Sequence, residues 1–144
     1  MISICDIPCT KNFDFTKVKV EELQEFTINL EFVIKKTTLM HGISSWFDSN
    51  FTGSLNETVL STSPYNPPTH WYQIRLLLPE PLAINKGQKI IGFIHFKANN
   101  IRSYYIYLKI GIEELNLWIE NTYDLKDPDF RGFSQYSYKP TTSN

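Results

Sequence analysis

The sequence predicts an all-β fold, an antiparallel barrel or sandwich, and three observations lead to this prediction. Apolar and polar residues alternate along most of the 144 residues, as they do in strands with one buried face. Aromatic residues make up 15% of the chain, and such residues favour pleated surfaces. Seven or eight alternating segments follow one another at short spacing, and no amphipathic helix of three turns interrupts them.

The first half of the chain contains four predicted strands. They span residues 13–20, 26–34, 40–47 and 55–61. The register of the first slips once, whereas the second alternates almost without interruption. Residues 21–25 form a polar connection between these two, and a turn at Gly53 is expected to join the third strand to the fourth.

The second half contains four more predicted strands, the last of them short. They span residues 72–78, 90–98, 104–112 and 115–119. Pro79 and Pro81 are expected to end the first of these, because proline cannot donate a hydrogen bond to the ladder. The turn-forming residues 85–88 separate it from the next strand. From Asp127 onward, Pro, Gly, Ser and Tyr replace the alternation.

Length and composition predict one globular domain. Apolar residues make up 42% of the chain and charged residues 20%. We expect an N-terminal segment over 1–12, a β-domain over 13–133 and a flexible tail over 134–144. No signal peptide and no apolar run of about 18 residues is visible, so an intracellular location without membrane contact is predicted. The net charge of −1 lacks the basic excess that direct nucleic-acid binding requires.

Motifs of common catalytic and metal sites are absent from the sequence. There is no Gly-x-Gly-x-x-Gly or Walker-type loop to hold nucleotide phosphates. His41, His70 and His95 are far apart, and Cys5 and Cys9 have no histidine near them, so no metal site is predicted. His41 and His95 are interpreted as structural residues.

The best candidate for a binding site is the Pro-Pro-Thr-His-Trp-Tyr-Gln segment at residues 67–73. It leads into a predicted strand, so His70 and Trp71 stand side by side at the rim of a sheet, where binding residues concentrate. Pro67 and Pro68 stiffen the approach. Two interpretations remain open: the pair lines a binding site, or Trp71 packs at the start of the strand while His70 caps a turn.

Three segments, taken in order, resemble the protein arginine methyltransferases, and most closely the coactivator-associated (histone H3) branch. The first has His-Gly and Trp-Phe-Asp within residues 41–48. The second, residues 61–73, has Ser-Thr-Ser-Pro followed by Pro-Thr-His-Trp-Tyr-Gln, and the third, residues 124–131, has Asp-Leu-Lys-Asp-Pro and Phe-Arg. The resemblance runs from about Phe13 to Arg131. It implies the C-terminal β-barrel of that family, without the α/β cofactor domain that precedes it.

The resemblance also implies roles for individual residues. His70 would brace the active site by pairing with a carboxylate of the missing domain. Trp71 would form a wall of the arginine channel, where an indole face suits a planar cation. Tyr72 and Phe130 match positions of the peptide groove. No residue of this chain is implied to bind a cofactor or a metal, whereas the intact enzyme uses S-adenosylmethionine.

The function that the resemblance implies is that of a part of an S-adenosylmethionine-dependent protein arginine N-methyltransferase that is not catalytic alone. The intact enzyme would be a homodimer in the nucleus or cytoplasm, and would asymmetrically dimethylate arginines of proteins such as histones. Two alternatives stand beside it. One is a non-catalytic protein-interaction barrel derived from the family, and the other is an aromatic-lined β-sandwich that binds a ligand.

Overall fold

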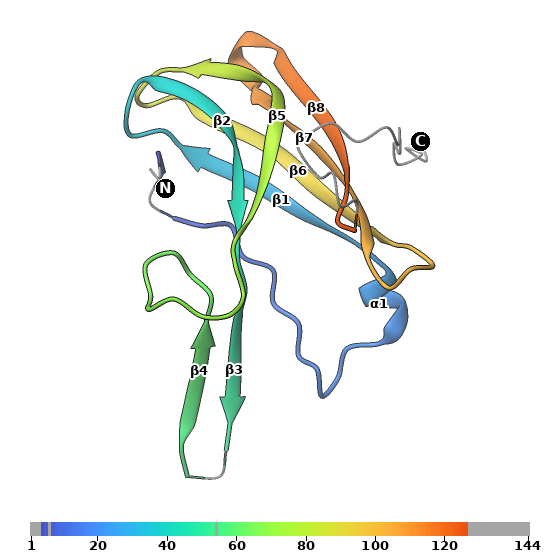
Figure 1. Cartoon of the computed structure of the whole chain (residues 1–144). Helices are drawn as coiled ribbons and strands as arrows, with labels where there is room; N and C mark the ends of the chain where they lie inside the picture. Colours follow the sequence, from blue (N-terminus) through green and yellow to red (C-terminus); the bar gives the residue numbers. More distant parts are fainter. Residues whose placement is uncertain (1–3, 6, 54, 127–144) are drawn as a thin grey trace.

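The structure, a computed structural model, describes residues 4–5, 7–53 and 55–126 (Figure 1). This part of the chain is almost entirely antiparallel sheet, with one α-helix, α1 (Val20–Gln24), and one 3₁₀ turn, η1 (Glu113–Leu115). The prediction of an all-β antiparallel fold is therefore confirmed. No sheet formed by the described residues closes into a barrel. Across these same residues, no helix has the length and apolar character needed to cross a membrane.

The strands form one larger sheet and two ribbons. They are β1 (Glu25–Val33), β2 (Thr38–Ser45), β3 (Asp48–Thr52), β4 (Glu57–Ser61), β5 (Ile74–Ile84), β6 (Lys89–Ala98), β7 (Tyr104–Ile112) and β8 (Leu117–Asp124). The larger sheet has the order β1-β6-β7-β8, while β2 pairs with β5 and β3 pairs with β4. The β2–β5 ribbon lies over the larger sheet, and the β3–β4 hairpin extends away from both (Figure 1).

The core lies between the four-stranded sheet and the β2–β5 ribbon. Along β1, β5, β6 and β7, alternate residues contribute to the core, which is why the predicted alternation locates it correctly. The buried side chains include Leu30, Ile90, Ile94, Ile106, Leu108 and Ile110 from the sheet, and Met40, Leu76, Leu78, Leu82 and Ile84 from the ribbon. Strand β7 has the predicted bounds, and the predicted strand over 26–34 is β1 shifted by one residue.

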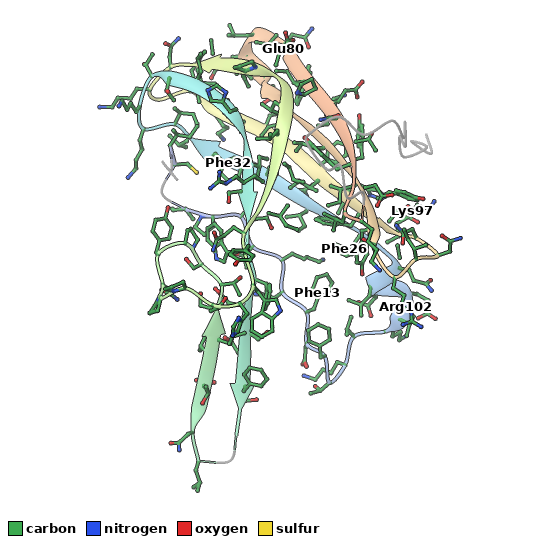
Figure 2. All side chains as sticks on the ribbon, viewed as in Figure 1. Phe13, Phe26, Phe32, Glu80, Lys97 and Arg102 are labelled. Atoms are coloured by element: carbon green, nitrogen blue, oxygen red, sulfur yellow. The ribbon has the colours of Figure 1, made fainter. Side chains whose placement is uncertain are left out.

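An aromatic cluster covers one end of the larger sheet. The ring of Phe26 stacks on that of Phe96 at 4.7 Å, and Phe13 from the N-terminal segment meets Phe26 edge-on at 5.0 Å (Figure 2). The hydroxyl of Tyr104 donates to the carbonyl oxygen of Leu23 in α1 at 2.7 Å. These contacts attach the chain before β1 to the sheet, although the described residues of that stretch form no strand.

Tyr123 links β8 to the β2–β5 ribbon. Its side chain is fully buried, and its hydroxyl donates to the carbonyl oxygen of Leu77 at 2.5 Å. The side-chain amide of Asn121 donates to the same oxygen at 3.2 Å. Burial raises the pKa of the Tyr123 hydroxyl to about 12.

We expect this tyrosine to make the protein less stable as the pH rises from 10 to 12. An unfolded tyrosine ionises near pH 10, so in that interval the unfolded state binds fewer protons than the folded state and the free energy of unfolding falls. Tyr123→Phe should lower that free energy by about 1 kcal/mol at pH 7, because a buried hydrogen bond is lost, and should reduce its alkaline slope. Urea unfolding at pH 7 and pH 11 measures both effects. Tyr65→Phe, at an exposed position, should change neither.

The predicted strand over residues 13–20 is wrong, because Asp14 starts a turn within it. The carboxylate of Asp14 accepts hydrogen bonds from the backbone N–H of Thr16 at 3.0 Å and from its hydroxyl at 2.6 Å. The N–H of Lys17 donates to the Asp14 carbonyl oxygen at 2.9 Å. Such local bonds compete with an extended strand. Helix α1 follows in place of the expected polar connection, and the Glu22 carboxylate caps its start.

The turn at Gly53 joins two strands, but the first of them is not the one predicted. Strand β2 ends at Ser45, and the separate strand β3 then pairs with β4 through Gly53. The sequence does not reveal β3, because Asp48, Ser49 and Asn50 are polar residues with low β propensity. Pairing with β4 along its whole length overrides that propensity.

Pro79 and Pro81 do not end the strand that begins after Gln73, because β5 continues through both to Ile84. Strand β5 pairs with β2 up to Leu77 and again from Leu82 onward. The two β2 residues that pair with Leu77 and Leu82 are only two positions apart, so β5 has extra residues between them. The prolines therefore lie in a bulge, where no ladder bond is required of them. This irregularity explains why a strand can tolerate two prolines.

The last predicted strand, over residues 115–119, is both displaced and too short. Residues 113–115 form η1, and Asn116 follows with a left-handed backbone at φ 48°. Strand β8 then pairs with β7 as far as Asp124. The second half of β8 shows no apolar alternation, because Thr122 and Asp124 are polar although they are buried with Tyr123. The predicted boundary at residues 133/134 lies outside the described residues.

Candidate functional site

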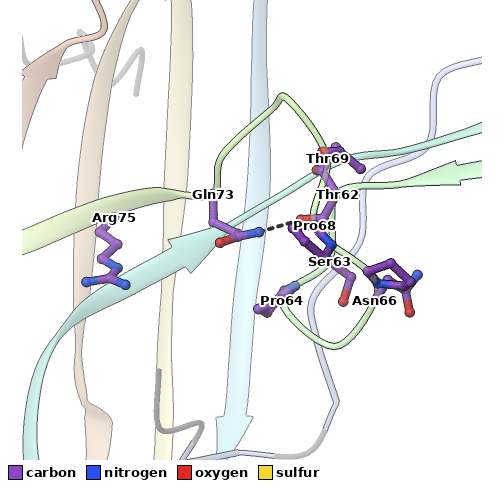
Figure 3. A pocket seen from close by; sticks show the side chains of 9 residues that line it. Thr62, Ser63, Pro64, Asn66, Pro68, Thr69, Gln73 and Arg75 are labelled. Atoms are coloured by element: carbon purple, nitrogen blue, oxygen red, sulfur yellow. Dashed lines mark hydrogen bonds between the residues drawn. The ribbon is translucent and has the colours of Figure 1, made fainter.

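The predicted site lies in the loop that connects β4 to β5. Thr62, at the start of this loop, forms hydrogen bonds that anchor it. The Thr62 side chain is 2% exposed, its hydroxyl donates to the carbonyl oxygen of Phe47 at 2.8 Å, and the Phe47 N–H donates to that hydroxyl at 3.0 Å. At the other end, the side-chain amide of Gln73 donates to the Thr62 carbonyl oxygen at 2.7 Å (Figure 3). This last bond holds the two ends of the loop together just before β5 begins.

Trp71 is fixed within this loop from two directions. The Thr69 hydroxyl accepts the N–H of Trp71 at 3.2 Å and donates to its carbonyl oxygen at 3.0 Å, which forms a tight local turn. The indole ring meets the ring of Phe47 edge-on, with the centroids 6.2 Å apart. His70 lies between the two residues of this turn. Its position is thus set by the loop backbone.

The predicted site residues that the structure describes are all exposed. The Trp71 side chain is 53% exposed and that of Tyr72 is 88% exposed, and His70 is exposed as well. An imidazole and an indole therefore stand next to each other at the entrance of β5, open to a partner. Phe130, the fourth predicted residue, lies outside the described residues. The roles implied for these residues stay predictions.

A polar pocket of about 320 Å³ adjoins the loop (Figure 3). Its lining is Thr62, Ser63, Pro64, Asn66, Pro67, Pro68, Thr69, Gln73 and Arg75. No carboxylate, thiol or imidazole lines it, so the pocket suits polar or anionic groups rather than a metal ion. Within the described part of the chain, no group of three or more His, Cys, Asp or Glu side chains is arranged to hold a metal.

The other histidines stay outside this site. The ring of His95 contacts the Thr27 hydroxyl at 2.9 Å and the Glu25 carboxylate at 3.0 Å, on the outer side of the larger sheet. This is the satisfied structural histidine that the sequence predicts. His41 lies on β2 and is exposed.

Thr62, Gln73 and Phe47 are the supporting residues that sequence reasoning missed. Thr62 belongs to a segment that carries the family resemblance, but nothing in the sequence pairs it with a glutamine eleven residues later. The contact becomes visible only because the loop folds back on itself. The ring of Phe47 is 45% exposed and lies against Trp71, a contact that the sequence motif does not reveal.

We expect Thr62→Val to destabilise the protein by about 1–3 kcal/mol and to loosen Trp71. The valine keeps the shape, but the Phe47 N–H loses its side-chain acceptor in a partly buried place. Urea unfolding measures the first effect, and acrylamide quenching of tryptophan emission measures the second. The matched control is Thr58→Val in β4, where the side chain is exposed. Equal behaviour of the two variants would contradict the anchoring role.

Comparison with known proteins identifies the family. The model of the arginine methyltransferase oligomerization subdomain matches residues 3–114. The probable histone-arginine methyltransferase CARMER of Drosophila melanogaster is 44% identical over 118 residues, which cover 82% of this chain and 22% of that protein. The histone-arginine methyltransferase CARMER of Drosophila yakuba matches with the same identity and coverage. The chain thus spans about a fifth of the length of these relatives.

A solved structure agrees with the sequence comparisons. A chain of the Trypanosoma brucei PRMT1 enzyme-prozyme heterotetrameric complex with AdoHcy superposes with a TM-score of 0.71 at 29% identity. The match covers 79% of this chain and 37% of that one. Fold, family model and relatives therefore agree. This chain belongs to the arginine methyltransferase family and corresponds to a part of its β-rich C-terminal domain.

Proposed function

We propose that this chain supplies one side of the arginine-binding cleft of an S-adenosylmethionine-dependent protein arginine N-methyltransferase. A cofactor-binding domain would supply the other side, and we refer to the two together as the assembled enzyme. The observation that carries the proposal is the exposed His70–Trp71 edge, held by an anchored loop in a member of this family. In this proposal the cofactor binds the other domain, and the chain is not catalytic alone.

The chemistry of arginine methylation explains why such an edge is needed. A guanidinium group stays protonated at ordinary pH, so its nitrogens are poor nucleophiles. Methyl transfer therefore requires carboxylates that fix and polarise the group and a methyl donor aligned with the attacking nitrogen. The exposed face of Trp71 suits a planar cation. It would hold the guanidinium while the other domain performs the transfer.

His70 is proposed as a bracing residue between the two domains. Its ring is exposed and makes no hydrogen bond or ion pair within the described residues, so it is free to bind a group of another domain. A carboxylate of the cofactor-binding domain is the partner that we propose. Tyr72, exposed beside it, and Phe130 would extend the groove along the peptide on either side of the target arginine.

The relatives support the donor and the substrate class in this proposal. The Trypanosoma brucei complex contains AdoHcy, which is what S-adenosylmethionine becomes after it loses its methyl group. The Drosophila proteins are described as histone-arginine methyltransferases. We therefore propose asymmetric dimethylation of arginines in histones or other proteins, in the nucleus or cytoplasm, by a homodimeric assembled enzyme.

Reconstitution tests this function. The complementary part, meaning the Drosophila melanogaster relative without its matched 118 residues, is prepared in a form that retains S-adenosylmethionine with a labelled methyl group. We expect label in an arginine peptide only after this chain is added, and none in the same peptide with lysine in place of arginine. Association without transfer would instead support a non-catalytic interaction module. Equal transfer without this chain would also contradict the proposal.

A further inference from the structure

The polar pocket beside the candidate loop has a single charged side chain in its lining, that of Arg75. The other lining residues are prolines and uncharged residues with hydroxyl or amide groups. Arg75 extends from β5 on one side of the pocket, whereas Ser63 and Asn66 lie on the other side (Figure 3). The pocket therefore combines one cation with neutral polar groups.

The guanidinium group of Arg75 has no counter-charge within the described part of the chain. The side chain is exposed, and it makes no hydrogen bond or ion pair with another described residue. No Asp or Glu side chain is among the described residues that line the pocket. An arginine stays protonated and presents several N–H donors in a planar arrangement that matches carboxylates and phosphates. The lining thus gives the pocket a positive potential.

Two neutral lining residues have donors available for the same ligand. The Ser63 hydroxyl accepts the N–H of Tyr65 at 3.3 Å, which uses an oxygen lone pair and leaves the hydroxyl proton to donate. The side-chain amide of Asn66 is exposed and binds no other described residue. A volume of about 320 Å³ has room for one anionic side chain together with bridging waters. The ligand chemistry that matches these groups is an oxygen anion, which only accepts hydrogen bonds.

The polar pocket and the proposed arginine cleft share one loop. Thr69 lines the pocket, and its hydroxyl forms hydrogen bonds with the N–H and the carbonyl oxygen of Trp71 at 3.2 and 3.0 Å. Arg75 follows Trp71 by four residues, and four residues of chain span at most about 14 Å. An extended peptide covers this distance with about four of its own residues. A peptide whose arginine is held at Trp71 can therefore place a neighbouring side chain in the pocket.

We propose that the polar pocket binds an anionic side chain located within about four residues of the target arginine, and that Arg75 selects this side chain. The inference rests on the proposed function, because it assumes that a substrate arginine is held at Trp71. It defines a substrate class, namely proteins with a carboxylate or a phosphate close to the target arginine. Arg75 binds this group through charge-assisted hydrogen bonds, and Ser63 and Asn66 supply further donors.

Pairs of arginine peptides test the proposal in the assembled enzyme. Each pair carries Glu or Gln at one of the four positions on either side of the target arginine. At one or two neighbouring positions we expect kcat/KM to be about 3- to 10-fold higher with Glu, as for a partly exposed charge-assisted hydrogen bond. Arg75→Gln should abolish this preference, and Arg75→Glu should favour Lys over Gln at the same position. Phosphoserine compared with Glu at that position distinguishes a phosphate from a carboxylate as the preferred group.

Arg102→Gln is the matched control. Arg102 is also exposed, but it lies in the turn between β6 and β7, away from the candidate loop (Figure 2). The preference for Glu should persist in this variant. Equal rates for Glu and Gln at every position would overturn the proposal. An unchanged preference in Arg75→Gln, or a loss of the preference in Arg102→Gln, would overturn it as well.

Binding of the same peptides separates this inference from the proposed function. The peptides carry a fluorescent label, and anisotropy with the assembled enzyme measures their dissociation constants. Tighter binding of the Glu peptide that depends on Arg75, without methyl transfer to any peptide, would support the pocket and refute the function. Methyl transfer at equal rates to both members of every pair would overturn the pocket and leave the function standing.

Discussion

Trp71→Ala and His70→Ala are each expected to lower kcat/KM for methylation of an arginine peptide by about 10- to 1000-fold in the assembled enzyme. This range corresponds to about 1.4–4 kcal/mol of lost transition-state stabilisation. Trp71→Ala removes the aromatic face that holds the guanidinium, an interaction of about 2 kcal/mol when water is excluded. His70→Ala removes the brace to the other domain. Initial rates with a labelled methyl donor measure both effects.

Two further variants make this prediction specific. Trp71→Phe keeps an aromatic face and should retain more activity than Trp71→Ala. Trp118→Ala removes another partly exposed indole, which lies on β8 with the ammonium of Lys109 5.4 Å from its ring. This variant should transfer methyl groups at the wild-type rate. Undiminished transfer by Trp71→Ala or His70→Ala would refute the role given to that residue.

Gly92→Ala should have the largest effect on stability, of the order of 4 kcal/mol or more. A Cβ atom at Gly92 would lie 2.1 Å from the carbonyl oxygen of Lys109 and 2.7 Å from the Cα atom of Ile110. Both are backbone atoms of β7, so the clash cannot be relieved by a side-chain movement. Strand β6 would have to move away from β7 within the four-stranded sheet. Urea unfolding measures the loss of stability.

Gly87→Ala is the matched control for this substitution. Gly87 occupies the turn between β5 and β6 with φ of 89°, and a Cβ atom there would have no heavy atom within 4 Å. Only backbone strain of about 1–2 kcal/mol is therefore expected. A smaller loss for Gly92→Ala than for Gly87→Ala would show that the two central strands are less tightly packed than this structure indicates.

The parts of the fold that were predicted correctly are those where alternation coincides with burial. Strand β7 is such a case, because its inward residues Ile106, Leu108 and Ile110 are all apolar. The errors arise where local chemistry or tertiary contacts override the pattern. Asp14 bends an apolar alternating segment into a turn, and a bulge carries β5 through two prolines. Neither effect follows from periodicity.

For the candidate site, the sequence predicts exposure but not the contacts that anchor the loop. The position of His70 and Trp71 next to a strand predicted an exposed rim, and the described geometry agrees with it. The anchoring contacts of Thr62 with Phe47 and Gln73 link residues eleven to fifteen positions apart through a folded loop. Strand β3 was missed because its first three residues are polar. Such features depend on three-dimensional pairing and leave no periodic signal.

The most direct test of the proposed arginine cleft is the emission of Trp71 itself. In the assembled enzyme with Trp46→Phe and Trp118→Phe in this chain, and with the tryptophans of the complementary part also replaced by phenylalanine, Trp71 is the remaining tryptophan. Titration with an arginine peptide should change its emission to saturation, because the guanidinium would stack on the indole. The same peptide with neutral citrulline in place of arginine should give a much weaker response. No change with the arginine peptide, under conditions where methyl transfer proceeds, would contradict the account.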